Sequence, residues 1–274
     1  MTAYDPLCPP CLADPPARDD DIPWHANRAG LILDLDGTLI REHQPIEGAA
    51  ALLDAYRGRF VIVSNNSTHT ARQLARRLCA MGLPVRARDL VLAGEQMVQY
   101  LCASHAGARV LMRASPALQR QAATRGCRLV ARDADVVALA LDKAFDYAAL
   151  AAVAHEVARG ARLVVSNIDL SHPGPDGRIV PETGALLRAV QGCTGVPPWH
   201  VVGKPEPAMF REGLRRLGGT AAATLVVGDN PDTDAAGAVR AGLQYVLVGS
   251  SPLAAAATPA QLLASDCAAR SRLA

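Results

Sequence analysis

Acidic side chains gather in two short segments whose spacing suits chemistry on a charged substrate. Asp34 and Asp36 lie at the end of an apolar run, residues 31–35, and Asp229 and Asp234 follow a second apolar run nearly two hundred residues later. Carboxylates this close together raise one another's pKa unless a cation neutralises them, and oxygen ligands favour Mg²⁺. The two segments are therefore candidate magnesium ligands, although each alone could be an acidic N-cap of the next helix.

Two further apolar runs end in residues that could bind phosphate. The run Phe60–Val63 is followed by Ser64 and Asn65, which offer a hydroxyl group and backbone N–H groups at the start of a helix. The run Val201–Gly203 is followed by Lys204, which supplies a point charge. Taken alone, the segment with Ser64 and Asn65 could be an N-cap cluster, and Lys204 could be a solvated lysine. Four polar strand ends in one chain favour a common site.

The elements that must position these residues alternate between apolar strands and helical patterns. We expect strands at Leu31–Leu35, Phe60–Val63, Leu90–Leu92, Arg109–Met112, Val136–Leu141, Leu163–Val165, Val201–Val202, Thr224–Val227 and Tyr245–Val248. Amphipathic helical patterns lie between most of them. Strands this apolar are buried on both faces, which predicts an α/β fold with a parallel sheet and ligands at the carboxyl ends of its strands.

The distances between the polar segments predict an inserted domain. Ser64 follows Asp34 by 30 residues, which suits one helix and one strand, whereas Lys204 follows Ser64 by 140 residues. A single β-α-β crossover needs far fewer. We therefore expect a core domain at 29–104 and 191–274, an inserted α/β cap domain at 105–190 that can close over the site, and a flexible leader at 1–28.

Composition excludes several classes of protein. The chain has 274 residues, of which 50% are apolar and 20% charged, with a net charge of +2. Basic and acidic residues are interspersed, so we expect neither nucleic acid nor a membrane as a partner. Without an apolar span or a signal peptide, a cytoplasmic location is expected. Seven scattered cysteines fit reduced thiols, and Cys8 and Cys11 lack the second pair that a four-cysteine zinc site needs.

The four polar segments, in their order along the chain, resemble the motifs of the haloacid dehalogenase superfamily. The matching segments are Asp34-Leu-Asp36-Gly-Thr-Leu39, Ser64-Asn65-Asn66, Lys204-Pro205 and Gly228-Asp229 with Thr233-Asp234. Residues 202–207, 141–147 and 166–169 also resemble the class IIA capped phosphatases, a group related to bacterial nucleotide phosphatases, phosphoglycolate phosphatase and pyridoxal phosphate phosphatase. The resemblance covers about residues 29–250 and implies a Rossmann-like parallel-sheet core with an inserted cap.

The resemblance also implies a role for each carboxylate. Asp34 would attack phosphorus and form an aspartyl-phosphate, while Asp36 would act as general acid and then general base. The Asp34 carboxylate, the Asp36 backbone carbonyl and Asp229 would hold Mg²⁺, and Asp234 would act indirectly, outside the set of metal ligands. This implies a magnesium-dependent phosphatase that hydrolyses a small phosphorylated metabolite.

The remaining motif residues would bind the phosphoryl group and the substrate. Ser64 and the Asn65 backbone would contact phosphoryl oxygens, and Lys204 would offset charge on the nucleophile and the phosphate. In the cap, Asn167 and Asp169 would contact the leaving group, unless they only form an Asn/Asp turn. Sugar phosphates, nucleoside monophosphates, phosphoglycolate and pyridoxal phosphate all stay open as substrates. Relatives often pair through the cap, which makes a homodimer possible.

Three other functions would use similar residues. A dehalogenase also has the first aspartate but needs neither Asp36 nor a metal. A receiver-like phosphoryl-binding module has similar strand ends but no large insert. A catalytically silent scaffold usually lacks the nucleophile or the lysine, and both Asp34 and Lys204 are present. Magnesium-dependent release of phosphate from an aryl phosphate would separate the phosphatase from all three.

Overall fold

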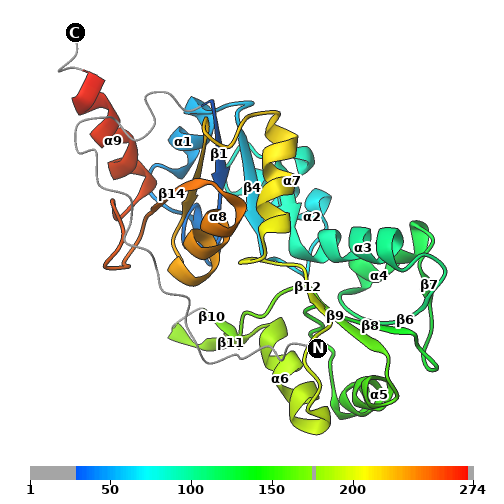
Figure 1. Ribbon diagram of the computed structural model, residues 1–274. Coiled ribbons are helices and arrows are strands. Elements are labelled where there is room, and N and C mark those ends of the chain that lie inside the picture. The colour runs from blue at the N-terminus through cyan, green and yellow to red at the C-terminus, as the bar shows by residue number, and fades with distance from the viewer. Residues whose placement is uncertain (1–28, 175–176, 271–274) are drawn as a thin grey trace.

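The computed structural model describes residues 29–174 and 177–270 (Figure 1). The predicted leader, 1–28, lies outside the described residues, as do Cys8 and Cys11 within it. No helix in the described ranges is long and apolar enough to span a lipid bilayer.

Five parallel strands form the first sheet, in the order β14-β13-β1-β4-β5. Their bounds are β1 Gly30–Leu33, β4 Phe60–Ser64, β5 Leu90–Leu92, β13 Thr224–Gly228 and β14 Gln244–Leu247. Successive side chains point to opposite faces, so Leu31 and Leu33 pack into one layer and Ile32 into the other. Both faces are buried, as the apolar runs predict.

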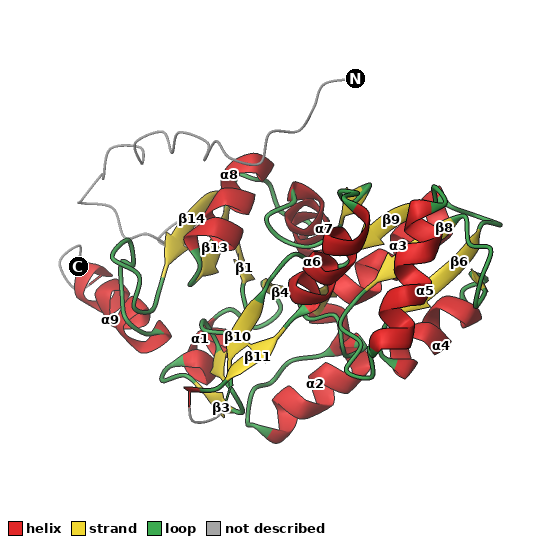
Figure 2. Ribbon diagram, turned by 90° about the horizontal axis from the view of Figure 1, so that it is seen from below, coloured by secondary structure: helices red, strands yellow, loops and turns green. Residues whose placement is uncertain are grey.

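Helices cover both faces of the first sheet (Figure 2). One layer contains α1 (Ala49–Ala55), α2 (Ala71–Ala80) and α9 (Pro259–Arg270), which contribute Leu52, Leu78 and Leu262 among others. The opposite layer contains α3 (Ala93–Ser104), α7 (Pro207–Leu217) and α8 (Ala236–Ala241). This three-layer arrangement is the α/β fold expected from the sequence.

A second sheet of five parallel strands has the order β12-β9-β8-β6-β7. Its strands are β6 Arg109–Arg113, β7 Arg128–Leu129, β8 Val136–Leu139, β9 Arg162–Val165 and β12 His200–Val201. Helices α5 (Tyr147–Ala158) and α6 (Thr183–Thr194) pack on one face, while α4 (Pro116–Thr124) and α3 pack on the other. Helix α3 thus belongs to an apolar layer that is continuous between the two sheets.

The second sheet reaches further along the chain than the expected boundary at residue 190. Helix α6 continues to Thr194, and β12 pairs with β9 through His200 opposite Val164. Spacing could not show this, because the segment 201–202 is apolar and reads equally well as a strand of either sheet. The segment that carries Lys204 therefore leaves the second sheet directly and enters the site.

Several short elements differ from the expected pattern. Strands β10 (Ser171–Pro173) and β11 (Ile179–Pro181) pair in an antiparallel hairpin, and a smaller hairpin joins β2 (Ile40–Arg41) to β3 (Gln44–Pro45). A 3₁₀ turn at Ala87–Asp89 precedes β5. Strand β1 ends at Leu33 rather than Leu35, so Asp34 and Asp36 belong to the loop after the strand.

Candidate active site

The carboxyl ends of the three central strands bring the predicted residues together. Strand β1 lies between β13 and β4, so Asp34, Asp229 and Ser64 follow or end neighbouring parallel strands. The Asp34 backbone N–H donates to the Val227 carbonyl at 2.8 Å, which continues the β1–β13 pairing by one residue. Residues far apart in the sequence thus share one edge of the sheet.

Lys204 lies between two buried carboxylates. Its Nζ atom is 2.5 Å from Asp34 Oδ1 and 2.7 Å from Asp234 Oδ1, and all three side chains are less than a tenth exposed. Burial alone would lower the pKa of Lys204, but Asp234 and Asp34 more than offset it and raise the pKa well above its usual value. Burial raises the pKa of Asp34 well above its usual value, against the opposing charge of Lys204. The attraction of the two carboxylates offsets the cost of burying the charged ammonium group of Lys204.

Asp234 organises the loop after β13. One carboxylate oxygen faces Lys204, and the other accepts the backbone N–H groups of Asp229 and Asn230 at 3.2 and 3.1 Å. The segment Pro231–Ala235 forms a π-helical turn that returns Asp234 to the strand end. Because both oxygens are occupied by these donors, Asp234 holds its neighbours in place, which fits the indirect role expected for it.

Carboxylate oxygens of Asp34, Asp229 and Asp234 lie within 4.8 Å of one another. Burial and the charge of Asp234 raise the pKa of Asp229 to about 6, against the opposing charge of Lys204. A Cβ atom on Gly37, whose φ is +89°, would lie 2.0 Å from Asp229 Oδ2, so the backbone next to Asp36 closely approaches this carboxylate. The oxygen-only donors fit a hard divalent cation such as Mg²⁺.

Asp36 differs from Asp34 in its surroundings. Its side chain is exposed, yet the protein atoms around the carboxyl raise its pKa by desolvation, and the positive charges of Lys204 and His172 oppose that effect. His172 lies in β10, and its Nδ1 atom is 2.7 Å from Glu182 Oε1, so the two polar side chains are in contact beside the hairpin. The sequence does not indicate His172, because no apolar run or helical pattern marks its segment.

The loop after β4 holds Lys204 from a second side. Ser64 is buried, and its Oγ accepts the Asn66 N–H at 3.1 Å, which leaves the hydroxyl proton free to donate. The Asn65 side chain accepts the Lys204 N–H at 2.7 Å and donates to the Lys204 carbonyl at 3.2 Å and to Asp169 at 3.0 Å. The sequence assigned only the backbone of Asn65 to phosphate, so its positioning side chain was missed.

Asn167 is bound by other protein groups on all of its polar atoms. Its side chain is fully buried and donates to the Asn65 carbonyl at 2.8 Å, while its own oxygen accepts the Asp169 N–H at 3.2 Å. The latter contact is the Asn/Asp turn that the sequence left open as the alternative. The Asn167 amide thus links the second sheet to the loop after β4, and its expected contact with the leaving group stays a prediction. Asp169 remains half-buried beside Asn65.

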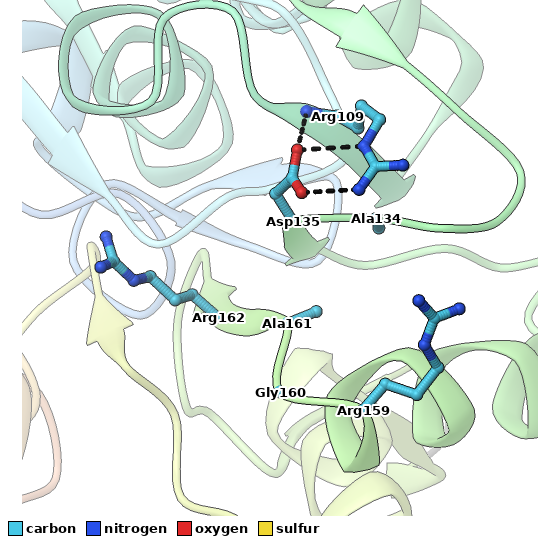
Figure 3. A pocket seen from close by; sticks show the side chains of 7 residues that line it. All are labelled: Arg109, Ala134, Asp135, Arg159, Gly160, Ala161 and Arg162. Atoms are coloured by element: carbon cyan, nitrogen blue, oxygen red, sulfur yellow. Dashed lines mark hydrogen bonds and ion pairs between the residues drawn. The ribbon is translucent and has the colours of Figure 1, made fainter.

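A pocket of about 290 Å³ lies elsewhere, at the amino ends of the strands of the second sheet (Figure 3). Arg109 and Asp135, which line it, form a bidentate ion pair with an N–O distance of 2.9 Å. Ligands of parallel α/β sheets bind at the carboxyl ends of the strands instead. We therefore do not assign this pocket to the substrate.

Comparison with known proteins identifies the family. Residues 31–128 match the family described as haloacid dehalogenase-like hydrolase, and residues 201–266 match a second family described as HAD-hydrolase-like. Over 214 residues the chain is 30% identical to an acid sugar phosphatase of Staphylococcus saprophyticus, covering 76% of this chain and 81% of that protein. The chain belongs to the haloacid dehalogenase-like hydrolases. The resemblance inferred from the four motifs is confirmed.

Other relatives of this hydrolase are also named phosphatases. It is 36% identical over 222 residues to D-glycerol 3-phosphate phosphatase of Mycobacterium tuberculosis, which covers 80% of this chain but only 62% of that protein. The structure of the glycerol phosphate phosphatase from M. tuberculosis in complex with magnesium has a TM-score of 0.76, with 35% identity, 82% of this chain and 69% of that chain covered. The α/β fold with parallel sheets is thus confirmed, and these relatives are enzymes of the predicted class.

Proposed function

We propose that this hydrolase is a Mg²⁺-dependent phosphatase acting on a small phosphorylated metabolite. The observation that carries the proposal is the cluster at the edge of the first sheet, in which Lys204 contacts Asp34 and Asp234 while Asp229 lies within reach of both carboxylates. A dehalogenase needs no metal, and a receiver domain has no second sheet of this size. The cluster and the second sheet therefore favour the phosphatase.

The nucleophile in this proposal is the Asp34 carboxylate. Lys204 and Thr38, which donate to its two oxygens at 2.5 and 3.1 Å, hold the carboxylate in one orientation. Attack on phosphorus forms an aspartyl-phosphate on Asp34 and releases the alcohol, and water then hydrolyses the acyl phosphate. The raised pKa of Asp36 suits a group that first donates a proton to the leaving oxygen and then accepts one from water.

The metal would be held by the Asp34 carboxylate, the Asp36 backbone carbonyl and the Asp229 carboxylate. When bound, Mg²⁺ supplies positive charge that offsets the negative charge of the carboxylates and of the phosphoryl oxygens. The Ser64 hydroxyl and the Asn65 N–H would donate to phosphoryl oxygens, because both follow β4 at the same edge of the sheet. Lys204 adds the positive charge that stabilises the transition state.

The second sheet would act as a cap over this edge. We propose that it comprises residues 105–202, since β12 is its last strand, and that it selects the substrate with Asp169 and the β10–β11 hairpin. The names of the relatives make glycerol phosphate and sugar phosphates the first esters to test. The match covers less than two thirds of the M. tuberculosis protein, so the substrate of this chain needs its own measurement.

The test is phosphate release from 4-nitrophenyl phosphate and from a panel of phosphorylated metabolites, with Mg²⁺ and after its removal by a chelator. We expect activity that requires Mg²⁺ and falls by several orders of magnitude in Asp34→Asn, because an amide is a poor nucleophile. Asp54→Asn, which alters an exposed aspartate on α1, is the matched control and should retain full activity. More than about a tenth of wild-type activity in Asp34→Asn would refute the aspartyl-phosphate mechanism.

A further inference from the structure

Two cysteines outside the active site face each other at short range. Cys102, in the last turn of α3, and Cys127, just before β7, have their sulfur atoms 3.2 Å apart. Both are free thiols in the structure, and both side chains are half-buried. Neither has a part in the proposed phosphatase chemistry.

The contact joins elements that the sequence separates. Cys102 also lies 3.7 Å from the Arg125 carbonyl, at the end of α4, so its thiol is held against the turn that carries Cys127. A disulfide bond has a sulfur–sulfur length of about 2.05 Å and needs Cβ atoms about 3.8 Å apart, which a sulfur contact this short brings within reach by small side-chain movements. Helices α3 and α4 pack in the same apolar layer, so the contact does not depend on a loose segment.

We propose that Cys102 and Cys127 form a site of reversible oxidation, at which a hydroperoxide converts the two thiols into an intramolecular disulfide. One thiol attacks the hydroperoxide, becomes a sulfenic acid and releases an alcohol, or water when the oxidant is hydrogen peroxide. The second thiol attacks the sulfenic sulfur, the S–O bond breaks, and water leaves with the second thiol's proton. A dithiol reductant reverses the change.

The surroundings assign different roles to the two sulfur atoms. Burial and the adjacent sulfur of Cys102 raise the pKa of the Cys127 thiol to about 12, so Cys127 stays protonated at neutral pH. The thiolate is the nucleophile in such reactions, so Cys127 is a poor first nucleophile, and its contact with Cys102 places it to resolve a sulfenic acid formed there. Resolution is fast because the partner is already in contact.

The disulfide should stabilise the fold, because it closes a loop in the unfolded chain and adds a crosslink between α3 and the edge strand of the second sheet. Cys79 and Cys193 differ from this pair. Both are exposed, and neither contacts a second sulfur among the residues that the structure describes. Cys193 therefore provides the matched control for a substitution that removes an uninvolved thiol.

The experiment treats the reduced full-length protein with hydrogen peroxide, alkylates the remaining thiols and digests it with trypsin without reduction. We expect residues 89–109 to be recovered linked to residues 126–128, and the link to disappear after dithiothreitol. The melting temperature of the oxidised protein should exceed that of the reduced protein by several degrees. Cys193→Ser should show the same link and the same shift, whereas Cys102→Ser and Cys127→Ser should show neither.

The reduced variants must melt within a few degrees of the reduced wild type, which shows that the serine substitutions leave the fold intact. Recovery of Cys102 and Cys127 as separately alkylated or separately over-oxidised peptides would overturn the proposal. So would an equal melting temperature for the linked and the reduced protein. Phosphatase activity is not part of this readout, so failure here leaves the proposed function untouched.

Discussion

Replacing Lys204 by methionine tests the charge balance of the active site directly. The side chain is 4% exposed, and its ammonium group contacts the carboxylates of Asp34 and Asp234. Methionine retains much of the apolar stem of lysine but removes the charge and all three N–H donors. The variant would therefore leave two buried carboxylates without their cation.

The expected loss follows from this burial. Removing one partner of a buried ion pair typically costs about 3–5 kcal/mol, because the other charge stays buried and unpaired. For a chain of this size, each kcal/mol lowers the melting temperature by roughly 2–4 °C, which predicts a fall of about 10 °C without added metal. Mg²⁺ at a hundredfold excess over its dissociation constant would add about 2.7 kcal/mol to the free energy of unfolding. Catalysis should fall by about a hundredfold or more even with Mg²⁺.

The assay is urea denaturation followed by circular dichroism, with and without Mg²⁺, on the wild type, K204M, D234N and the double variant. Because Lys204 and Asp234 are in contact, the double variant should lose less stability than the two single variants together. The exposed Lys143, the only other lysine in the chain, provides the control K143M, which should denature like the wild type. Equal denaturation midpoints for K204M and the wild type without metal would refute the argument, as would additive losses in the double variant.

Three further predictions each concern a substitution at a single position. Asn167→Ala should lower kcat/KM by a similar factor on every phosphate ester and also lower the melting temperature, because the buried amide links two parts of the protein. A changed ranking of substrates at an unchanged melting temperature would contradict this prediction. Gly37→Ala should raise the Mg²⁺ concentration for half-maximal activity by about tenfold, because the added Cβ would collide with Asp229, and an unchanged value would reject the close approach. Glu212→Gln should lower the free energy of unfolding by about 1 kcal/mol at pH 7, because the Glu212 carboxylate accepts hydrogen bonds from two arginines. One of them, Arg216, also donates to two backbone carbonyls, one just before β5 and one within it. Hydrogen bonds from these arginines lower the pKa of Glu212 to about 2. The difference in free energy of unfolding between Glu212→Gln and the wild type, measured by urea denaturation, should therefore shrink as pH falls from about 4.5 towards 2. A difference that stays constant over this range would contradict the prediction.

The strand ends could be predicted from the sequence because a parallel sheet allows few arrangements. Apolar runs such as Leu31–Leu35 mark strands buried on both faces, and parallel strands place all their carboxyl ends at one edge. The residues after those runs must then be neighbours, as Asp34 after β1 and Asp229 after β13 are, although they lie nearly two hundred positions apart in the sequence. That rule needs the order of elements and no knowledge of side-chain geometry.

The features that were missed depend on how the two sheets meet. Strand β12 has two residues and joins the second sheet only through its pairing with β9. The direction of the Asn167 amide depends on where the loop after β4 lies, because the two residues that it joins are 102 positions apart. Likewise, no periodicity indicates that His172 approaches Asp36, since this depends on the hairpin and its placement. Local pattern cannot supply such distances.

Charge explains why this site would need a divalent cation before it accepts phosphate. Asp34, Asp229 and Asp234 against the single ammonium of Lys204 leave a formal charge of −2 within a few ångströms. Two unit charges 4 Å apart interact by about 4 kcal/mol near a protein surface, so a phosphate dianion would be strongly repelled. Lys204 lowers this barrier but does not remove it, because its one positive charge stands against three carboxylates. We therefore expect phosphate affinity to depend steeply on Mg²⁺, since the divalent cation brings the buried cluster to neutrality.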